Sequence, residues 1–322
     1  MIEIFKSEPD GKLSVVLPEV YEQEGFAIKD CWINLVNPSD KEVAFVSSLT
    51  GIEDDALKAP LDDEERSRIE QEEEHLMVLV DMPVIDEEDD YYSYYTIPVG
   101  TFIKQNVIVT VSLRESTAVR DFVRGKVKNF RTDLKTRFLY QMLYNIAARF
   151  LSYLKQIDKA SARIQNELHK STKNKELIQM LDLENSLVYF ATSLSGNDTV
   201  ITRLLSIKNN RFLIAYEEEQ ELLEDVAVET KQAIEMCTIY RDILSGTMDA
   251  YASVISNNQN SIMKALAIIT LMMSIPTLVA SFFGMNTWLP GGQKVWGFVF
   301  AIALSVILVL AVFLVVKKKK LL

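Results

Sequence analysis

The chain has 322 residues, 48% of them hydrophobic, and a mean hydropathy of +0.08, which excludes a disordered protein. Its two cysteines, Cys31 and Cys237, lie far apart without a CxxC motif, which excludes a disulfide-stapled miniprotein and gives no zinc cluster or redox pair. No acidic residue follows Asp249, so residues 1–263 hold 28 Lys and Arg against 45 Asp and Glu, a net charge of −17. We therefore expect this part of the chain to attract cations and to have no nucleic-acid partner.

The first 130 residues alternate short apolar runs with turn signals. Strands are predicted at CWINLV before Asn37-Pro38, at LMVLVDM before Pro83, and at YYTIPVG and NVIVTVS. Helical spacing between them, from Ala44 to Ile52, predicts an α/β or α+β domain over residues 1–130, and we take α/β as the expected class.

Residues 131–214 have a helical pattern, in which Ser195-Gly196-Asn197 is predicted to separate two helices. No P-loop, GxSxG or dinucleotide fingerprint is present in the sequence, so neither an enzyme nor an organic cofactor is expected.

Two uncharged segments near the end of the chain, 265–285 and 295–316, are each long enough to span a bilayer. Lys317 to Lys320 mark the cytoplasmic side, so both termini and the basic tail 317–322 are expected inside the cell (inner or plasma) membrane, and the loop 286–294 outside. The N-terminus lacks a signal peptide, which agrees with a cytoplasmic position for the acidic body. The alternative, a single anchor preceded by a buried core helix, is disfavoured because the first segment carries no charge.

A single helix is predicted over residues 215–285, about 100 Å long at 1.5 Å per residue. One heptad-spaced row along it is small or polar apart from Met263, whereas large apolar residues occupy the other faces. This row, called the polar stripe below, consists of Asp242, Gly246, Asp249, Ser253, Ser256, Asn260, Met263, Ala267, Thr270, Ser274, Thr277, Ser281 and Gly284.

Two interpretations of the polar stripe are open. Small residues at this spacing allow two membrane helices to pack closely. Alternatively, several copies of the helix surround an axis and the stripe lines a pore. The stripe continues below the membrane through Ser253, Ser256 and Asn260, where packing in lipid is not at issue, and this favours the pore.

The outer end of the first span carries Gly284-Met285-Asn286, followed by a short loop, the second span and a lysine tail. In this combination the chain resembles the CorA family of magnesium and cobalt channels. The resemblance is closest in RDILSGTMDAY, SIMKALAII, IPT before FFGMN, and KKKKLL, and weaker at Trp32-Ile33-Asn34 and from Leu61 to Glu70.

The resemblance implies a funnel-shaped homopentamer, with an α/β cytoplasmic domain, stalk helices, an inner ring of first spans and an outer ring of second spans. It implies that Gly284, Met285 and Asn286 form the selectivity filter, where five Asn286 amides bind hydrated Mg²⁺. Met263 and Leu266 match a hydrophobic gate that closes by dewetting. The expected pore-lining residues are Asn260, Ala267, Thr270, Ser274, Thr277 and Ser281.

The resemblance also implies regulation by Mg²⁺ bound between cytoplasmic domains of neighbouring subunits. Asp225 and Asp249 match the acidic positions of the stalk, and carboxylates suit this hard cation. The N-terminal partner position falls near Lys58-Ala59, which has no carboxylate, and Asp62 and Asp63 are the nearby substitutes.

The leading hypothesis is thus a channel for Mg²⁺ influx, passing Co²⁺ or Ni²⁺ as well and closed by intracellular Mg²⁺. A proton-coupled Zn²⁺ transporter of the same superfamily is the first alternative, and the intact Met285 argues against it. A membrane scaffold or cation sensor without transport is the second alternative. The outer loop departs from the family because it contains no acid and carries Lys294.

Overall fold

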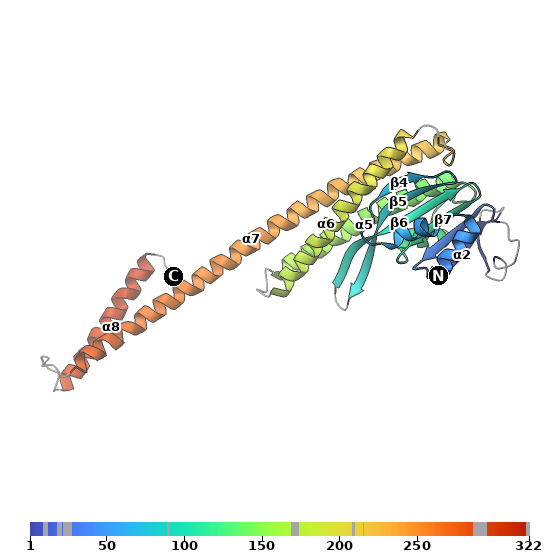
Figure 1. Cartoon of the computed structure of the whole chain (residues 1–322). Helices are drawn as coiled ribbons and strands as arrows, with labels where there is room; N and C mark the ends of the chain where they lie inside the picture. The colour runs from blue at the N-terminus through green and yellow to red at the C-terminus, as the bar shows by residue number, and fades with distance from the viewer. Residues whose placement is uncertain are drawn as a thin grey trace. The chain divides into compact units, whose positions relative to one another are not determined.

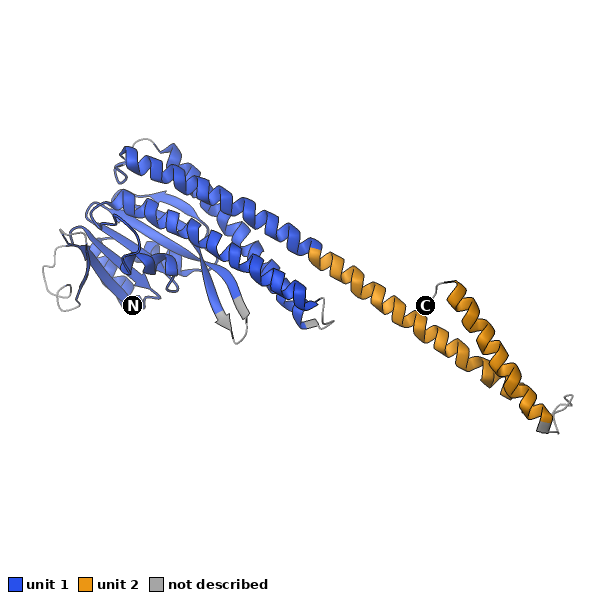
Figure 2. Ribbon diagram, turned by 180° about the vertical axis from the view of Figure 1, so that it is seen from behind, with its two compact units in different colours: residues 1–246 blue, residues 247–322 orange. Residues whose placement is uncertain are grey.

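The computed structural model describes residues 1–8, 12–17, 21, 28–88, 91–168, 174–207, 210–214, 216–285 and 295–319. The chain divides into two compact units, residues 1–246 (unit 1) and residues 247–322 (unit 2), which are described separately (Figure 2).

Unit 1 is built on one seven-stranded sheet in the order β2-β1-β3-β7-β6-β5-β4 (Figure 1). Only β3 and β7 pair in parallel, and all other neighbours in the sheet are antiparallel. The strands are β1 Ile2–Ser7, β2 Leu13–Val16, β3 Cys31–Val36, β4 Arg68–Gln71, β5 His75–Glu88, β6 Tyr91–Lys104 and β7 Val107–Ser112.

Both faces of the central strands β3 and β7 are buried, which explains their nearly continuous apolar sequences. On one face Ile33, Leu35 and Val109 belong to a cluster that includes Val43 and Val46 of α2 (Asp40–Thr50). α3 (Asp54–Lys58) and the 3₁₀ helix η1 (Ala59–Leu61) follow α2.

On the other face Trp32 is fully buried among the rings of Phe5, Phe122, Phe130 and Phe138. Its Nε1 donates to Thr110 Oγ1 at 2.8 Å, and that hydroxyl donates to Asn34 Oδ1 at 2.9 Å, so the buried polar atoms are satisfied. The helices of this side are α4 (Thr117–Val123), α5 (Lys135–Leu168) and α6 (Asn174–Ser206).

The prediction that Ser195-Gly196-Asn197 separates two helices is wrong, because these residues lie inside α6. Gly196 is needed for close packing, since a Cβ there would come within 3.0 Å of Ser67 Oγ. The Asn197 side chain bonds the backbone N and O of Asp81 at 2.8 and 2.7 Å. Tertiary contacts therefore explain residues that, read alone, are typical of a turn.

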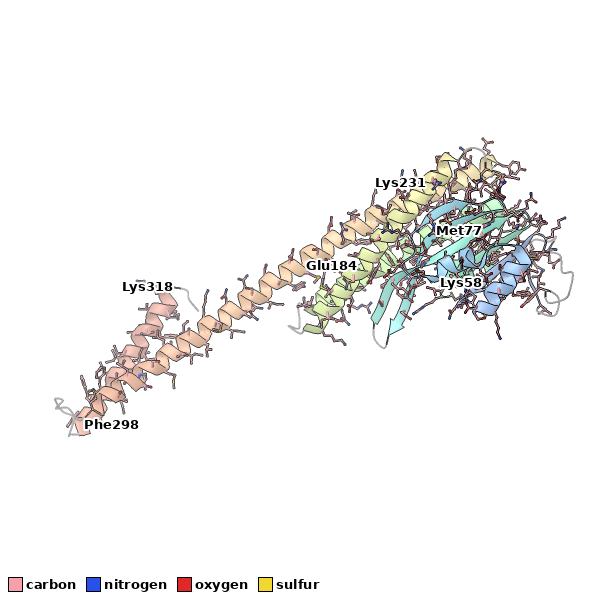
Figure 3. All side chains as sticks on the ribbon, viewed as in Figure 1. Lys58, Met77, Glu184, Lys231, Phe298 and Lys318 are labelled. Atoms are coloured by element: carbon pink, nitrogen blue, oxygen red, sulfur yellow. The ribbon has the colours of Figure 1, made fainter. Side chains whose placement is uncertain are left out.

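Helix α7 (Glu217–Phe283) has 67 residues, beginning in unit 1 and ending in unit 2, and α8 (Val295–Lys318) follows it. Each has a stretch long and apolar enough to cross a membrane. Large apolar side chains of unit 2 project outward, with Trp296 79% exposed and Leu266 56% exposed (Figure 3). Such a surface suits lipid or neighbouring subunits rather than water.

The chain is therefore an α/β domain followed by a long helix and a C-terminal apolar helix, which confirms the predicted fold class.

Candidate functional site

The part of α7 in unit 1 buries one row of residues at heptad spacing. The row consists of Glu219, Leu223, Val226, Thr230, Ala233, Cys237 and Leu244. Cys237 Sγ donates to the Leu187 carbonyl of α6 at 3.3 Å, which places α6 beside this row. Asp242 and Gly246 of the polar stripe lie two residues before and two residues after Leu244 and are exposed, so they occupy another face.

The part of α7 in unit 2 repeats this separation of faces. Its partly or fully buried residues within the apolar span recur every three or four positions: Ala265, Ile268, Met272, Ile275, Val279 and Phe283. All stripe residues from Asp249 to Gly284 are exposed, and those from Met263 to Ser281 each lie two positions, or 200°, from a residue of this row. The stripe and the buried row are therefore on opposite sides of the helix.

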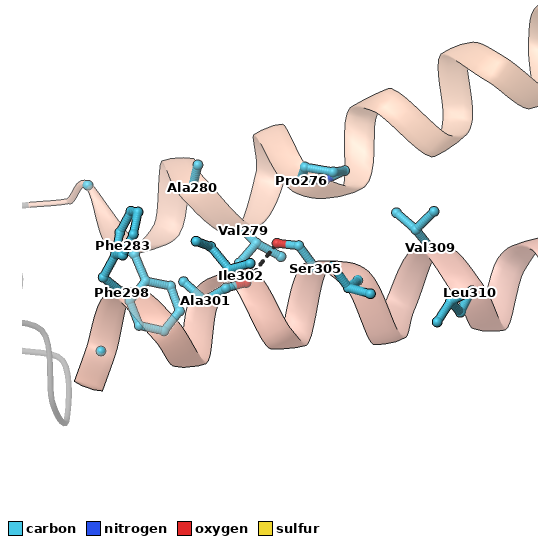
Figure 4. A pocket seen from close by; sticks show the side chains of 13 residues that line it. Pro276, Val279, Ala280, Phe283, Phe298, Ala301, Ile302, Ser305, Val309 and Leu310 are labelled. Atoms are coloured by element: carbon cyan, nitrogen blue, oxygen red, sulfur yellow. Dashed lines mark hydrogen bonds between the residues drawn. The ribbon is translucent and has the colours of Figure 1, made fainter. Parts of the chain in front are cut away.

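Helix α8 lies against the outer end of that row. The ring of Phe283 lies 6.4 Å from the ring of Phe300, and a cleft of about 780 Å³ separates the two helices. Val279, Phe283, Phe298 and Ile302 are among the residues that line it (Figure 4). α8 thus lies on the side of α7 opposite the stripe residues from Thr270 to Ser281 and leaves these open, whereas Gly284 at the end of the stripe lines the cleft.

Three hydroxyls of the stripe within the apolar span bond their own backbone. Thr270, Ser274 and Thr277 donate to the carbonyls four residues earlier, at 2.9, 2.8 and 3.0 Å. Because each proton is used in this way, the oxygen presents lone pairs to its surroundings. These hydroxyls and Ser281 line a hollow of about 520 Å³ together with apolar residues such as Met273 and Leu278. The hollow therefore offers hydrogen-bond acceptors, which suit the water molecules around a hydrated cation.

The expected gate residues precede these hydroxyls in α7. Met263 is 63% exposed and Leu266 is 56% exposed, and they lie between Asn260 and Ala267 in the chain. Exposed thioether and alkyl groups at this point form an apolar band on a polar face.

The structure describes two of the three filter residues. Gly284 and Met285 lie in the turn that ends α7, where their N–H groups donate to the carbonyls of Ala280 and Phe282. A Cβ on Gly284 would come within 3.2 Å of the Ala280 carbonyl oxygen, so the close turn favours glycine. Asn286 and the outer loop with Lys294 lie outside the described residues.

The acidic residues of the expected regulatory site are exposed and dispersed. Asp225 lies in unit 1 and Asp249 in unit 2, both on α7, whereas Asp62 and Asp63 follow η1. Within the described ranges, no three His, Cys, Asp or Glu side chains of one chain gather to hold a metal. A site built from these carboxylates would need a second subunit.

Sequence analysis did not single out two further acids close to Lys58. The hydrogen bond and charge of Asp40 raise the pKa of Lys58, and Asp54 and Asp55 in the first turn of α3 add a smaller effect in the same direction. The ammonium of Lys58 lies 2.7 Å from an Asp40 oxygen. In the sequence, the feature that could have drawn attention to Asp54 and Asp55 is that they are consecutive acids at the start of a short helix.

Comparison with known proteins extends over nearly the whole chain. The cobalt/magnesium transport protein CorA of Methanocaldococcus jannaschii is 27% identical over 320 residues, which cover 96% of each chain. The protein of the same name from Thermotoga maritima is 24% identical over 297 residues, covering 90% of this chain and 82% of the relative. The complete structure of the CorA magnesium transporter from M. jannaschii has the same fold, with a TM-score of 0.80 at 23% identity and coverage of 99% of this chain and 98% of that one.

A family model described as the CorA-like Mg²⁺ transporter protein matches residues 29–318. The match includes most of the α/β domain, both apolar helices and the polar stripe. Since it accounts for most of the sequence, the chain belongs to the CorA-like Mg²⁺ transporter family.

Proposed function

We propose that five copies of the chain surround a central pore that conducts Mg²⁺ into the cell, with Co²⁺ and Ni²⁺ as further ions. One observation carries this proposal: α8 covers one side of α7 and leaves a row of hydroxyl acceptors open on the other. Around an axis these oxygens line a wet path, and α8 then falls in an outer ring against lipid. The relatives named for magnesium and cobalt transport support the choice of ions.

In this pore Asn286, with Gly284 and Met285, forms the outer filter. Mg²⁺ gives up its water reluctantly, so a ring of amide oxygens binds the hydrated ion weakly enough to release it inward. Thr277, Ser274 and Thr270 then receive its water molecules, with Ser281, Ala267 and Asn260 also lining the path. Met263 and Leu266 close the path by dewetting when their rings narrow.

The acidic unit 1 and both termini lie in the cytoplasm in this proposal, and Lys317–Lys319 stay on that side of the membrane. The membrane potential then drives the ion inward with about 2.3 kcal/mol per charge per 100 mV. Asp225 and Asp249, with Asp62 and Asp63 of a neighbouring subunit, bind intracellular Mg²⁺ and stabilise the closed arrangement.

The proposal is tested by ion uptake into proteoliposomes that contain a Mg²⁺-sensitive dye. Thr277→Leu places a larger apolar side chain on the stripe, and Asn286→Ala removes the filter amide. We expect each to reduce Mg²⁺ uptake by roughly tenfold or more, the loss caused by removing a good ligand or hydrating group from a narrow path.

The matched control is Ala280→Leu, a similar enlargement one position from Ser281 that fills the cleft toward α8 instead. It should retain uptake within about twofold, since the cleft has room for added methyl groups. Equal loss in Thr277→Leu and Ala280→Leu would contradict a pore along the stripe. Proton-dependent Zn²⁺ flux without Mg²⁺ flux would indicate the zinc transporter, and no flux of any ion would indicate the scaffold or sensor.

A further inference from the structure

Unit 1 contains a basic cavity that the transport function does not use. Its volume is about 690 Å³, and it lies between the residue before β2, the segment after α4 and the first turn of α5. Four cations line it, Lys12, Arg124, Arg131 and Arg137, and none of the described lining residues is acidic. A cavity of this size is in the range of small-molecule sites.

The cavity interrupts an otherwise acidic domain. Residues 120–137 hold seven Lys and Arg against two Asp, whereas residues 1–263 as a whole carry a net charge of −17. A local concentration of positive charge in a body of opposite sign attracts anions to one place.

Two of the arginines are held in position by carboxylates outside the cavity. Arg131 donates from Nε and Nη2 to Asp133 at 2.9 Å each. Arg137 donates from Nε to Glu219 at 2.9 Å and from Nη2 to Glu218. A guanidinium has five N–H groups in a fixed plane, so each arginine keeps donors for a ligand while its orientation is fixed.

Arg124 differs from these two because it is exposed and forms no ion pair with any described residue. It follows α4 directly and lines the cavity beside Gly125, which adopts a positive φ of 66°. Its full charge is therefore available to an anion.

The start of α5 adds a second, independent preference for an anion. This helix of 34 residues has no acid in its first turn, which instead carries Lys135 and Arg137. Cations at a helix N-terminus are unfavourable because the exposed N–H groups there carry partial positive charge. A bound anion would offset this electrostatic repulsion.

The remaining wall of the cavity is apolar. Val123 is 38% exposed and Leu134 is 36% exposed at its surface, and the ring of Phe130 lies behind them, 8% exposed. Inorganic phosphate would leave this wall unused, whereas an organic group attached to the phosphate would cover it.

We propose that this cavity binds a soluble organic polyphosphate of the nucleoside polyphosphate class. The phosphates contact Arg124, Arg131 and Arg137 at the start of α5, and the organic group lies against Val123 and Leu134. This site is independent of the pore, so failure of one proposal leaves the other standing.

The test is isothermal titration of the full chain in lipid-free detergent with EDTA, so that chelation of Mg²⁺ by the ligand plays no part. ATP is the probe. Inorganic tripolyphosphate tests the charge without the organic group, and adenosine tests the organic group without the charge. We expect saturable ATP binding, several-fold weaker tripolyphosphate binding and no adenosine binding. Arg124→Gln should weaken ATP binding by about tenfold, as expected for loss of one charge-assisted contact.

The matched control is Lys128→Gln, which removes the same charge from the same segment. Lys128 is exposed, forms no ion pair with the described residues and does not line the cavity, so ATP binding should change by less than about twofold. Thermal unfolding of both variants checks that the domain is intact.

Three results would overturn the proposal. One is the absence of saturable ATP binding to the intact chain, and another is equal weakening by Arg124→Gln and Lys128→Gln. The third is tighter binding of a water-soluble short-chain phosphatidic acid than of ATP, which would assign the cavity to a lipid headgroup.

Discussion

At the scale of single residues, hydrogen bonds determine what each polar side chain can offer. The hydroxyls of Thr270, Ser274 and Thr277 use their protons on the backbone and present only acceptors. Asn197 offers nothing to its surroundings in this way, because its side-chain oxygen and nitrogen both bond the backbone of Asp81 and the residue is 4% exposed. The first group is suited to contact water or ions, and Asn197 to hold α6 against the sheet.

His75 provides a residue-scale prediction about pH. Its side chain is 7% exposed and lies beside the ring of Phe102, and burial lowers the pKa of His75 below its usual 6.5. The unfolded chain therefore takes up a proton near pH 6.5 that the folded chain resists. Stability from this group is complete above pH 6.5 and decreases as the pH falls toward the lowered pKa.

We expect the melting temperature of the parent chain to fall between pH 7 and pH 5.5 more steeply than that of His75→Gln, measured by intrinsic fluorescence in detergent. His169 is present in both proteins, so the difference between them isolates His75. An equal fall in the melting temperatures of both proteins across this pH range would contradict the role of His75. Above pH 7 the difference between parent and variant should be constant, which serves as the internal control.

At the scale of elements, α7 combines two unlike faces in one helix. A row of buried residues packs on unit 1 near its start and beneath α8 near its end, and the polar stripe lies on another side in each unit. Pro276 interrupts the hydrogen-bond ladder of α7 within the apolar span, on the side where it lines the cleft with α8. The helix is thus specified by patterning and neighbours together, since its mid-section has few buried contacts.

Helix α2 provides the element-scale prediction, because it begins with a complete capping box. Ser39 Oγ accepts from the Glu42 backbone N–H at 3.4 Å, and the Glu42 carboxylate accepts from the Ser39 N–H at 2.8 Å. Ser39→Ala removes one of these bonds and should lower the free energy of unfolding by about 1 kcal/mol. The change is measured by chemical denaturation followed by circular dichroism.

Ser48→Ala is the control within the same helix. The Ser48 hydroxyl donates to the Phe45 carbonyl on the exposed side of α2, so its loss should change the free energy of unfolding by less than about 0.5 kcal/mol. Similar destabilisation by both substitutions would show that the cap has no special contribution.

At the scale of the whole molecule, family membership confirms that the chain is a transporter component and not an enzyme. It also explains the composition of unit 2, whose apolar side chains are exposed on nearly every face. A membrane covers such a surface, and in the proposed pore the polar stripe is the part that faces neighbouring subunits.

Assembly provides the prediction at this scale. Native mass spectrometry of the detergent-solubilised protein should give a complex of five chains of 36.6 kDa each. A ring with an axial stripe needs heterologous contacts that close, and five is the number implied by resemblance to the family. A dimer or monomer that still transports Mg²⁺ would contradict the pore around an axis.

Much of the fold could be predicted because its signals are local. The runs CWINLV and NVIVTVS became the central strands β3 and β7, since a short and nearly continuous apolar run is typical of a strand buried on both faces. The Ser195-Gly196-Asn197 prediction was wrong because these residues contact Ser67 and Asp81. Both contacts are more than 100 positions away in the sequence. No local pattern contains such a contact.

The candidate site divides in the same way. The polar stripe is visible in the sequence because helical spacing alone determines which residues share a face of one helix. The basic cavity is not, because Lys12 and Arg137 come together only when the sheet, α4 and α5 are packed.

The sequence by itself determined the two apolar helices, the small and polar row along α7 and the acidic character of the body, since these follow from composition and periodicity. Only the tertiary structure decided that α8 covers the opposite side of α7, that the stripe hydroxyls present acceptors, and that distant cations share one cavity. The physical reason is that periodicity specifies directions around one element, whereas burial and hydrogen bonding depend on which other elements occupy those directions.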